Sequence, residues 1–229
     1  MQQGFIFDMD GTMVDNMMTH HRAWQMKLQE LGMDMSLHEV HRTIHGKNEE
    51  IIEKLFGTRF TPEQRLQIAG EKEMRYRDVF LPELKLIEGL HKFLMDCLSQ
   101  YIPLSIGTAA PPENVNFVLN NLNLHPFFKK VVNSDDVSLG KPNPEVFEKA
   151  ATGMGIPLSH CLIFEDSPIG ATTAHNAGCP VVVVLTTHKK EEFEHLPNVV
   201  KYINDYTEIT VEEALGFIEE IVKIDPLSI

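Results

Sequence analysis

The sequence predicts an α/β protein, with a doubly wound (Rossmann-like), mainly parallel sheet and a small all-helical domain inserted after the first strand. The apolar run Gly4–Phe7 ends at Asp8, as expected of a buried strand that feeds a loop. After Pro82, strand-like apolar segments alternate with helical segments, an order typical of a parallel sheet covered by helices on both faces. From Asn16 to Phe80 the apolar residues instead recur at helical spacing, and no segment there is a convincing strand.

Four further strands are predicted after the insert, each preceded by a helix. The runs Pro-Val-Val-Val-Val-Leu and Cys-Leu-Ile-Phe suit strands that are buried on both faces. The predicted strands are Ile102–Gly107, Lys130–Asn133, Cys161–Phe164 and Pro180–Leu185. The predicted helices are Glu88–Ser99, Pro112–Leu122, Pro144–Met154 and Ile169–Ala177. Ligands bind beyond the carboxyl ends of such strands, so the residues just after each strand are the candidates for a site.

The helical insert divides the chain into two predicted domains, an α/β core of residues 1–15 and 81–229 and a helical domain of residues 16–80. Trp24, Leu28 and Leu31 form one apolar stripe, and Gly32 follows where a helix C-terminus is expected. Further helices are predicted at Leu37–Ile44, Asn48–Phe56 and Thr61–Phe80.

Composition and charge favour a cytoplasmic protein that binds neither nucleic acid nor membranes. Hydrophobic residues make up 43% of the chain, but no run approaches the roughly 20 apolar residues that span a bilayer, and the N-terminus does not resemble a secretory signal. The formal charge of −13 repels nucleic acid and anionic lipid. Cys97, Cys161 and Cys179 lack the spacing of a disulfide or zinc framework and are expected to be buried thiols in a reducing compartment.

Charged and polar side chains follow the predicted strands. Asp8 and Asp10 come after the first strand, Thr108 after the second, and Glu165 with Asp166 after the strand at 161–164; Lys141 lies in a Gly-Lys-Pro-Asn-Pro loop. Four carboxylates in one crevice repel each other strongly unless a hard divalent cation binds there, and Mg²⁺ fits because it takes carboxylate oxygens. Any one of these acids alone would suit a turn or a helix cap, but their joint occurrence indicates a site.

These residues resemble the four motifs of the haloacid dehalogenase-like phosphotransferases. The resemblance rests on Phe-Asp-Met-Asp-Gly-Thr at 7–12, on Thr108, on Lys141 and on the Glu165-Asp166 pair, in that order along the chain. The helical insert is similar to the small cap domain of the β-phosphoglucomutase-like subgroup. The resemblance therefore covers essentially the whole chain.

The resemblance implies a role for each motif residue. Asp8 would be the nucleophile that forms an aspartyl-phosphate, and Asp10 the general acid and base. Mg²⁺ would be held by Asp8, Glu165, Asp166 and the main-chain carbonyl of Asp10. Lys141 would neutralise developing charge on the phosphoryl group. The phosphoryl oxygens would be bound by Thr108 and by the backbone amides of Gly11 and Ala109, with Thr12 beside them, although Gly11 also suits a tight turn and Thr12 a helix N-cap.

Other polar and soft residues are given structural interpretations. Ser167 is expected to cap the helix that follows it, although it could instead orient Asp166. The histidines at 38, 41 and 45 recur at helical spacing, and a solvated helix face is favoured over a zinc site. The methionines Met9, Met13, Met17, Met18 and Met26 are expected to fill gaps in the core and near the cap hinge.

The cap sequence bears on the substrate, which the core motifs do not specify. His20, Arg22, Ala23 and Trp24 resemble the corresponding cap segment of β-phosphoglucomutase, which favours a sugar phosphate. The loop His45-Gly46-Lys47-Asn48-Glu49 has Glu49 where that mutase places an arginine, so a second phosphate would be repelled, with Lys47 as a partial replacement. We therefore favour a phosphatase for a small phosphorylated metabolite over a phosphosugar mutase. A dehalogenase and a non-catalytic phospholigand-binding protein are less favoured than either. The predicted substrate-binding residues of the cap are His20, Gly46, Lys47 and Glu49.

Overall fold

The computed structural model describes residues 2–44 and 47–224, with side chains up to Glu219. Contacts group the chain into two compact units, one of Met1–Asp15 with Lys85–Ile229 and one of Asn16–Leu84. We call them the core and the cap, and each is described by itself. Among the described residues, no helix is long and apolar enough to cross a membrane.

The core contains a six-stranded, fully parallel sheet in the order β3-β2-β1-β4-β5-β6. Its strands are β1 (Gly4–Phe7), β2 (Leu104–Gly107), β3 (Lys130–Val132), β4 (Cys161–Glu165), β5 (Val181–Val184) and β6 (Val199–Ile203). The chain runs outward from β1 to β3 and then returns to β4 on the other side of β1. The predicted fold class is thus confirmed, and the reversal between β1 and β4 is the place where such sheets bind ligands.

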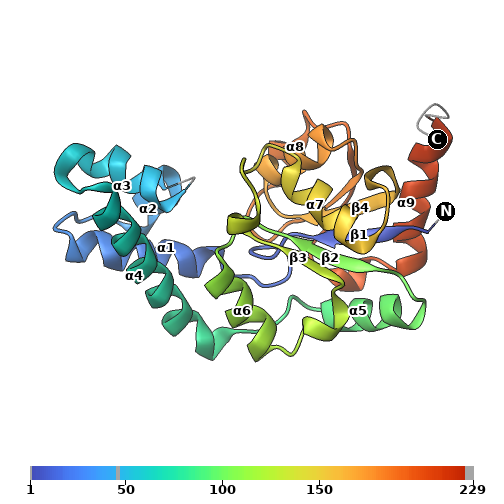
Figure 1. Cartoon of the computed structure of the whole chain (residues 1–229), viewed down its shortest axis with the longest axis horizontal. Helices are drawn as coiled ribbons and strands as arrows, with labels where there is room; N and C mark the ends of the chain where they lie inside the picture. The colour runs from blue at the N-terminus through green and yellow to red at the C-terminus, as the bar shows by residue number, and fades with distance from the viewer. Residues whose placement is uncertain (1, 45–46, 225–229) are drawn as a thin grey trace. The chain divides into compact units, whose positions relative to one another are not determined.

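Helices cover the sheet on both faces, with α7 and α8 on one and α5 and α6 on the other (Figure 1). The core helices are α5 (Leu90–Ser99), α6 (Pro112–Asn121), α7 (Glu145–Met154), α8 (Pro168–Asn176) and α9 (Val211–Ile224). The sequence patterns did not predict β6 and α9. Four of the five β6 residues are only half-buried, so this edge strand lacks the continuous apolar run that marks β4 and β5.

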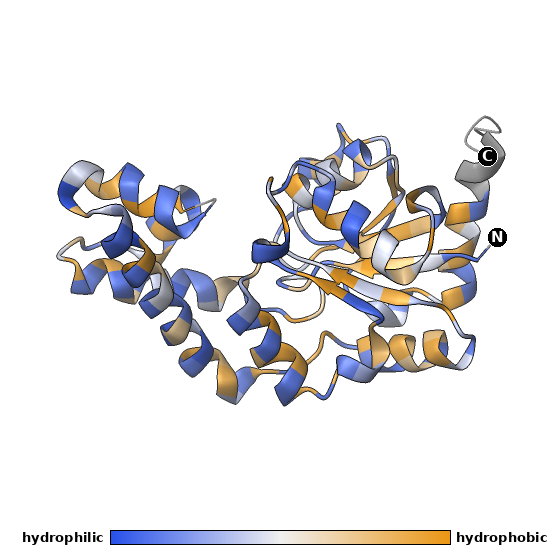
Figure 2. Ribbon diagram, in the orientation of Figure 1, coloured by the Kyte–Doolittle hydropathy of each residue, from blue (hydrophilic) through white to orange (hydrophobic). Residues whose placement is uncertain are grey.

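The side chains of β1 alternate between two apolar layers, as expected for a strand. Ile6 packs into the layer beneath α7 and α8, with Phe147 and Ile163. Phe7 faces the opposite layer, where its ring stacks on that of Phe164 at a centroid distance of 4.7 Å. Apolar side chains therefore fill both sides of the sheet, and the helices are correspondingly banded with hydrophobic and hydrophilic residues in Figure 2.

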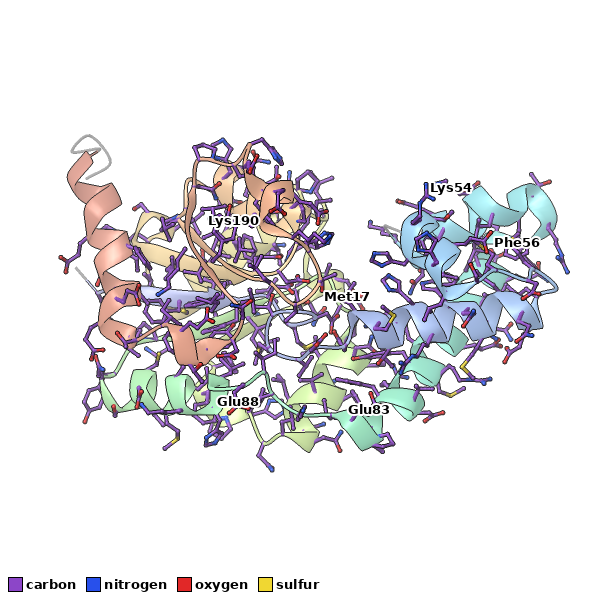
Figure 3. The ribbon with its side chains drawn as sticks, turned by 180° about the vertical axis from the view of Figure 1, so that it is seen from behind. Met17, Lys54, Phe56, Glu83, Glu88 and Lys190 are labelled. Carbon is purple, nitrogen blue, oxygen red and sulfur yellow. The ribbon has the colours of Figure 1, made fainter. Side chains whose placement is uncertain are left out.

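The described part of the cap is entirely helical, as predicted. Its helices are α1 (Met17–Glu30), α2 (Leu37–Thr43), α3 (Asn48–Phe56) and α4 (Pro62–Phe80); Figure 3 marks Met17, Phe56 and, near the end of the unit, Glu83. Ser36 and Thr61 begin α2 and α4 with capping boxes, and Gly32 has the positive φ of 84° expected just beyond α1. Trp24, Leu28, Val40 and Ile52 form the centre of the cap's apolar core.

The predictions for the sulfur-containing residues hold only in part. All three cysteines are buried free thiols, and Met9 and Met13 are completely buried. Met18 and Met26 are 46% and 37% exposed, so the prediction that they fill gaps is wrong for these two. Both lie on α1, whose apolar stripe of Trp24 and Leu28 faces the cap interior instead.

Candidate active site

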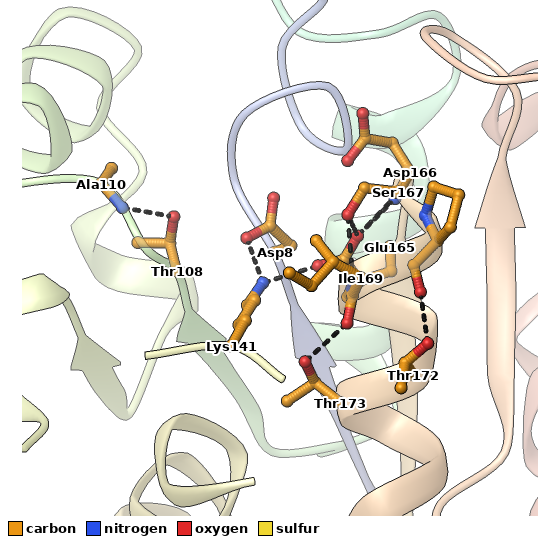
Figure 4. Close-up of polar contacts among 12 residues, drawn as sticks. Asp8, Thr108, Ala110, Lys141, Glu165, Asp166, Ser167, Ile169, Thr172 and Thr173 are labelled. Carbon is orange, nitrogen blue, oxygen red and sulfur yellow. Dashed lines mark hydrogen bonds and ion pairs between the residues drawn. The ribbon is translucent and has the colours of Figure 1, made fainter. Parts of the chain in front are cut away.

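Four of the predicted site residues meet at the carboxyl ends of β1 and β4. Asp8 follows β1, Glu165 ends β4, and Asp166 comes next. Lys141 reaches them from the loop that precedes α7. Figure 4 shows its ammonium between the carboxylates of Asp8 and Glu165. The site therefore lies at the carboxyl ends of the strands, as the sequence predicts, and at the reversal point of the sheet.

The Lys141 side chain is buried between two carboxylates. Its Nζ donates to Asp8 Oδ1 at 2.7 Å and to Glu165 Oε1 at 2.6 Å, and it lies 5.0 Å from the centre of the Phe147 ring. The loop that carries Lys141 is fastened at its base, because the Glu145 carboxylate accepts hydrogen bonds from the amides of residues 138 and 139 at 2.9 Å each. The ammonium is thus held in place by the fold as well as by its partners.

The Glu165 carboxylate is folded back against the first turn of α8. Its Oε2 accepts hydrogen bonds from the Asp166 and Ser167 amides at 2.8 and 2.9 Å and from Ser167 Oγ at 3.0 Å. A side chain at Gly170 would collide with it, since an added Cβ would stand 1.7 Å from Glu165 Oε1. Ser167 Oγ also accepts from the Gly170 amide at 3.1 Å, so the predicted helix cap is confirmed.

Burial and crowding set the charge of this cluster. Burial, more than any other cause, raises the pKa of Asp8 to about 7, although Lys141 acts in the opposite direction. Burial also raises the pKa of Asp166 well above its ordinary value, and the neighbouring Glu165 and Asp8 carboxylates add to that rise. For Lys141, burial alone would lower the pKa, but the two carboxylates raise it above the ordinary value, so it stays charged.

The segment from Asp8 to Val14 forms a closed turn. The Met9 carbonyl accepts hydrogen bonds from the amides of residues 12, 13 and 14, and the Gly11 amide donates to the Val14 carbonyl at 2.8 Å. Gly11 has a φ of 78°, and a Cβ there would come within 2.1 Å of Asp166 Oδ2, so glycine is needed. The predicted phosphate-binding residues Gly11 and Thr12 are both buried here, while Asp10 is half-buried.

The end of β2 supplies a hydroxyl and a turn. Thr108 is buried, and its Oγ1 accepts a hydrogen bond from the Ala110 amide at 3.1 Å. The Thr108 amide donates to the Val132 carbonyl of β3 at 3.0 Å. Ala109, whose amide is predicted to bind phosphate, is exposed. This turn thus places backbone at the surface beside a fixed hydroxyl.

In the cap, His20 belongs to a buried polar cluster that the sequence patterns did not predict. Lys72 Nζ lies 3.1 Å from His20 Nδ1, and because an ammonium only donates, Nδ1 is the acceptor. Lys72 also donates to Glu73 Oε1 at 2.7 Å, and Asn48 Nδ2 donates to the same oxygen at 2.7 Å. The His20 ring stacks on that of Tyr76 at 3.7 Å. Burial, followed by the nearby Lys72 charge, lowers the pKa of His20 to about 3.

The other predicted cap residues lie at the start of α3. Lys47 is the exposed N-cap and Glu49 stands half-buried in the first turn. Gly46 and His45 lie outside the described residues. His38 and His41 are exposed, in line with a solvated face.

Asp8, Glu165 and Asp166 form the one group of three or more potential metal ligands among the described residues.

Residues 5–184 match the sequence profile of the haloacid dehalogenase-like hydrolases. The chain is a haloacid dehalogenase-like hydrolase. The matched region contains Asp8, Thr108, Lys141, Glu165 and Asp166, and it runs through the whole cap. The predicted resemblance and the predicted enzyme class, a phosphatase or hydrolase of this family, are therefore confirmed.

Relatives of this haloacid dehalogenase-like hydrolase include phosphatases. It is 30% identical over 186 residues to the 6-phosphogluconate phosphatase of Escherichia coli K12, covering 78% of this chain and 80% of that one. The fructose-1-phosphate phosphatase of the same bacterium is 28% identical over 184 residues, covering 79% and 95%. The crystal structure of β-phosphoglucomutase from Clostridium difficile matches with a TM-score of 0.82 at 23% identity, covering 97% of this chain and 100% of that one. This last likeness concerns the fold, and it extends over both units.

The acidic triad of this hydrolase fits a metal ion. One oxygen from each of Asp8, Glu165 and Asp166 lies within 4.8 Å of the others. Three buried carboxylates face a single ammonium, so the ionised cluster carries a net charge of 3 × (−1) + 1 = −2. Oxygen ligands with surplus negative charge suit a hard cation rather than one that prefers nitrogen or sulfur.

Three residues near the site were missed, namely Thr186, Thr187 and Tyr206. The two threonines stand just beyond β5, so the strand-end rule that selected Asp8 and Thr108 also points to them. Tyr206 follows the unpredicted strand β6. Because that strand was not predicted, no sequence pattern indicated that Tyr206 lies near the site.

Proposed function

We propose that the protein is a Mg²⁺-dependent phosphatase that hydrolyses a small phosphorylated metabolite of the sugar phosphate class through an aspartyl-phosphate on Asp8. The observation that carries the proposal is the buried cluster at the ends of β1 and β4. There a fixed ammonium contacts Asp8 Oδ1 at 2.7 Å and Glu165 Oε1 at 2.6 Å, and Asp166 adds a third carboxylate to the same cluster. The relatives named for phosphatase activity on 6-phosphogluconate and fructose 1-phosphate support the substrate class.

In the first step, a carboxylate oxygen of Asp8 attacks phosphorus and forms a new P–O bond, while the bond from phosphorus to the ester oxygen breaks. Asp10 gives its proton to the departing oxygen, so that an alcohol leaves rather than an alkoxide. Lys141 and Thr108 offset the charge on the phosphoryl oxygens. Mg²⁺, when bound by Asp8, Asp166 and their neighbours, supplies the positive charge that the single ammonium does not.

In the second step, Asp10, now a carboxylate, takes a proton from water, and the water oxygen attacks the phosphorus of the aspartyl-phosphate. The P–O bond to Asp8 breaks, which releases inorganic phosphate and regenerates the Asp8 carboxylate. Splitting one displacement into two allows a single carboxylate to serve as acid and then as base. Glu49 in the cap disfavours a mutase, because a carboxylate there would repel a second phosphate.

The test is acid quenching of the enzyme during turnover of a ³²P-labelled sugar phosphate, with p-nitrophenyl phosphate as the general substrate. We expect wild type to carry label that is stable in acid and labile in base, and D8N to be folded, unlabelled and inactive. D15N is the matched control, since Asp15 is exposed and lies outside the motif. Inversion of configuration at phosphorus, or activity retained by D8N, would refute the covalent route.

A further inference from the structure

Three successive carbonyl groups beside the nucleophile are held by three distant parts of the core. Thr186 Oγ1 donates to the Gly11 carbonyl at 2.5 Å, and Tyr206 Oη donates to the Thr12 carbonyl at 3.0 Å. The Ile87 amide donates to the Met13 carbonyl at 2.9 Å. Thr186 and Tyr206 lie beyond residue 184, where the match to the family ends.

These anchors act on a segment that also has hydrogen bonds of its own. The amides of residues 12, 13 and 14 all donate to the Met9 carbonyl, and the Gly11 amide donates to Val14. Because a peptide group is planar, fixing a carbonyl also fixes the amide of the next residue. The outer anchors and the inner turn together determine the path of the backbone between Asp8 and Val14.

Tyr206 is built as a rigid donor. It is 2% exposed, and its ring packs against those of Phe7, Phe93 and Phe164 at centroid distances of 6.2, 5.8 and 5.6 Å. Burial, with added repulsion from Asp8 and Asp166, raises the pKa of its hydroxyl well above the ordinary value. The hydroxyl therefore keeps its proton and donates to Thr12 at any working pH.

Thr186 occupies the corresponding place beyond β5. The backbone around it is fixed, since the Leu185 amide donates to the Ile203 carbonyl at 2.8 Å and the Thr186 amide to that of Val184 at 3.0 Å. The Gly11 carbonyl that it holds is buried, so an apolar residue at 186 would leave that carbonyl without this donor. The neighbouring Thr187 hydrogen-bonds to Asp166, so the two adjacent threonines contact the Gly11 turn and the acidic cluster respectively.

We propose that Thr186 and Tyr206 are positioning residues of the phosphoryl-transfer site, which hold the Gly11 and Thr12 carbonyls so that Asp8 and Asp10 face the phosphorus and the leaving oxygen. This inference rests on the proposed function. Neither residue touches the reacting atoms, and each acts through one backbone hydrogen bond. A displacement of about 1 Å at a reacting group can reduce rate by roughly 100-fold, so loss of one anchor is expected to slow the chemistry.

The variants T186V and Y206F each remove one hydroxyl with little change in volume, and T186S keeps the hydroxyl. We measure kcat, KM and the single-turnover rate of Asp8 phosphorylation in the full chain at saturating Mg²⁺, with p-nitrophenyl phosphate. The expected result is a drop in kcat and in the phosphorylation rate of about 10-fold for T186V and for Y206F, with KM within about 2-fold. T186S should restore kcat to within about 2-fold of wild type.

Two matched controls remove hydroxyls elsewhere in the core. T173V deletes a buried hydroxyl that donates to the Ile169 carbonyl within α8 at 2.7 Å. Y202F deletes a tyrosine hydroxyl on β6, where the ring packs against Phe193. Both should keep the kcat of wild type even where their stability falls.

The outcomes separate the two proposals. If T186V and Y206F are less stable but keep the kcat of wild type, or if the controls lose as much kcat, the two residues are folding anchors only and the inference is wrong. If wild type turns over phosphate esters without forming phosphorylated Asp8, the proposed mechanism fails first and this inference fails with it. A selective, hydroxyl-dependent loss of phosphorylation rate supports the inference.

Discussion

Lys141 in the core and Lys72 in the cap are both buried and both contact a carboxylate, but their surroundings differ. Lys141 in the core is held by Asp8 and Glu165, with Asp166 close by. Lys72 in the cap is 2% exposed and is held by Glu73 at 2.7 Å and by His20 at 3.1 Å. Both ammonium groups therefore have short, direct contacts.

The difference lies in the balance of charge. When fully ionised, the core cluster of three carboxylates and one ammonium sums to −2, and burial and mutual repulsion raise the pKa of Asp8 and of Asp166 against that charge. The cap cluster instead pairs Lys72 with Glu73 around a His20 that is neutral at pH 7 because its pKa is about 3. A buried ion pair is tolerated when its members satisfy each other, and the cap cluster is complete in this sense. The core cluster has more carboxylates than ammonium groups, and such an excess of buried negative charge suits a cation-binding site rather than a structural ion pair.

The largest effect is expected at the core cluster, where a bound cation would offset the excess negative charge. D166N should lower kcat by about 1,000-fold or more, because it removes a cation ligand and weakens stabilisation of the transition state. In EDTA the same variant should be more stable than wild type, by on the order of 1–2 kcal/mol, since the buried charge and its repulsion are gone. Urea unfolding and steady-state kinetics measure the two effects. If D166N were less stable than wild type in EDTA, repulsion within the core cluster would not destabilise the folded protein.

The balanced cap pair should respond in the opposite way. E73Q leaves the Lys72 ammonium buried without a carboxylate, so the free energy of unfolding of the cap should fall by about 2–4 kcal/mol. Hydrogen exchange of amides in α1 and α4 reports this local stability. E53Q is the control, because Glu53 pairs with Arg65 from a side chain that is 60% exposed and should change stability by less than about 1 kcal/mol. If E73Q and E53Q lowered the free energy of unfolding equally, the buried Lys72–Glu73 pair would be no more important than an exposed pair.

A pH titration sharpens the comparison further. His20 is neutral in the folded cap down to about pH 3, whereas an unfolded chain protonates it near pH 6.5. The unfolded state therefore binds more protons as the pH falls, and folding loses about 1.4 kcal/mol per pH unit between those values, or roughly 2 kcal/mol at pH 5. Tyr76 stacks on the ring, and the charged or titratable groups around it are Lys72, Glu73 and His21.

The measurement for His20 is the difference in unfolding free energy between wild type and H20Q from pH 8 to pH 4. That difference should favour wild type at pH 8 and shrink steadily below pH 6.5. H38Q, at an exposed position of the same unit, should follow wild type throughout. A constant gap between wild type and H20Q would mean that His20 is not kept neutral by the fold.

The smallest effect concerns substrate choice. We propose that His20 and the residues before and within the first turn of α3 select the phosphate ester, because the core motifs recognise only a phosphoryl group and a cation. E49R should raise kcat/KM for a sugar bisphosphate by roughly 5- to 150-fold, which corresponds to about 1–3 kcal/mol, through a new bidentate phosphate partner. The change for p-nitrophenyl phosphate should be less than about 2-fold. E50R adds the same charge at the adjacent, exposed position. Equal effects of E49R and E50R would show that position 49 has no special role.

The core cluster was predictable because each member follows a strand in a parallel sheet, so position along the chain also gives position in space. Asp8, Glu165 and Asp166 needed no more than that rule, and Lys141 was predicted from its loop before a helix, with support from the family motifs. The cap cluster offers no such rule. Asn48 and Glu73 stand on different helices, and nothing in their spacing predicts that they share a hydrogen bond. Tyr206 was missed for the same reason, since its contact with Thr12 spans 194 positions.

The central claim is that a bound cation offsets the excess negative charge of the core cluster, whereas the charges of the cap cluster already balance. It is tested most directly by the Tm as a function of Mg²⁺ concentration. A ligand that binds only the folded state raises the Tm, and the rise grows with the ligand concentration relative to its Kd. We predict a rise for wild type, no rise for D166N, and a rise of the same size for E73Q from a lower starting Tm. An equal rise in wild type and D166N, or no rise in wild type over a range that supports turnover, would contradict the claim.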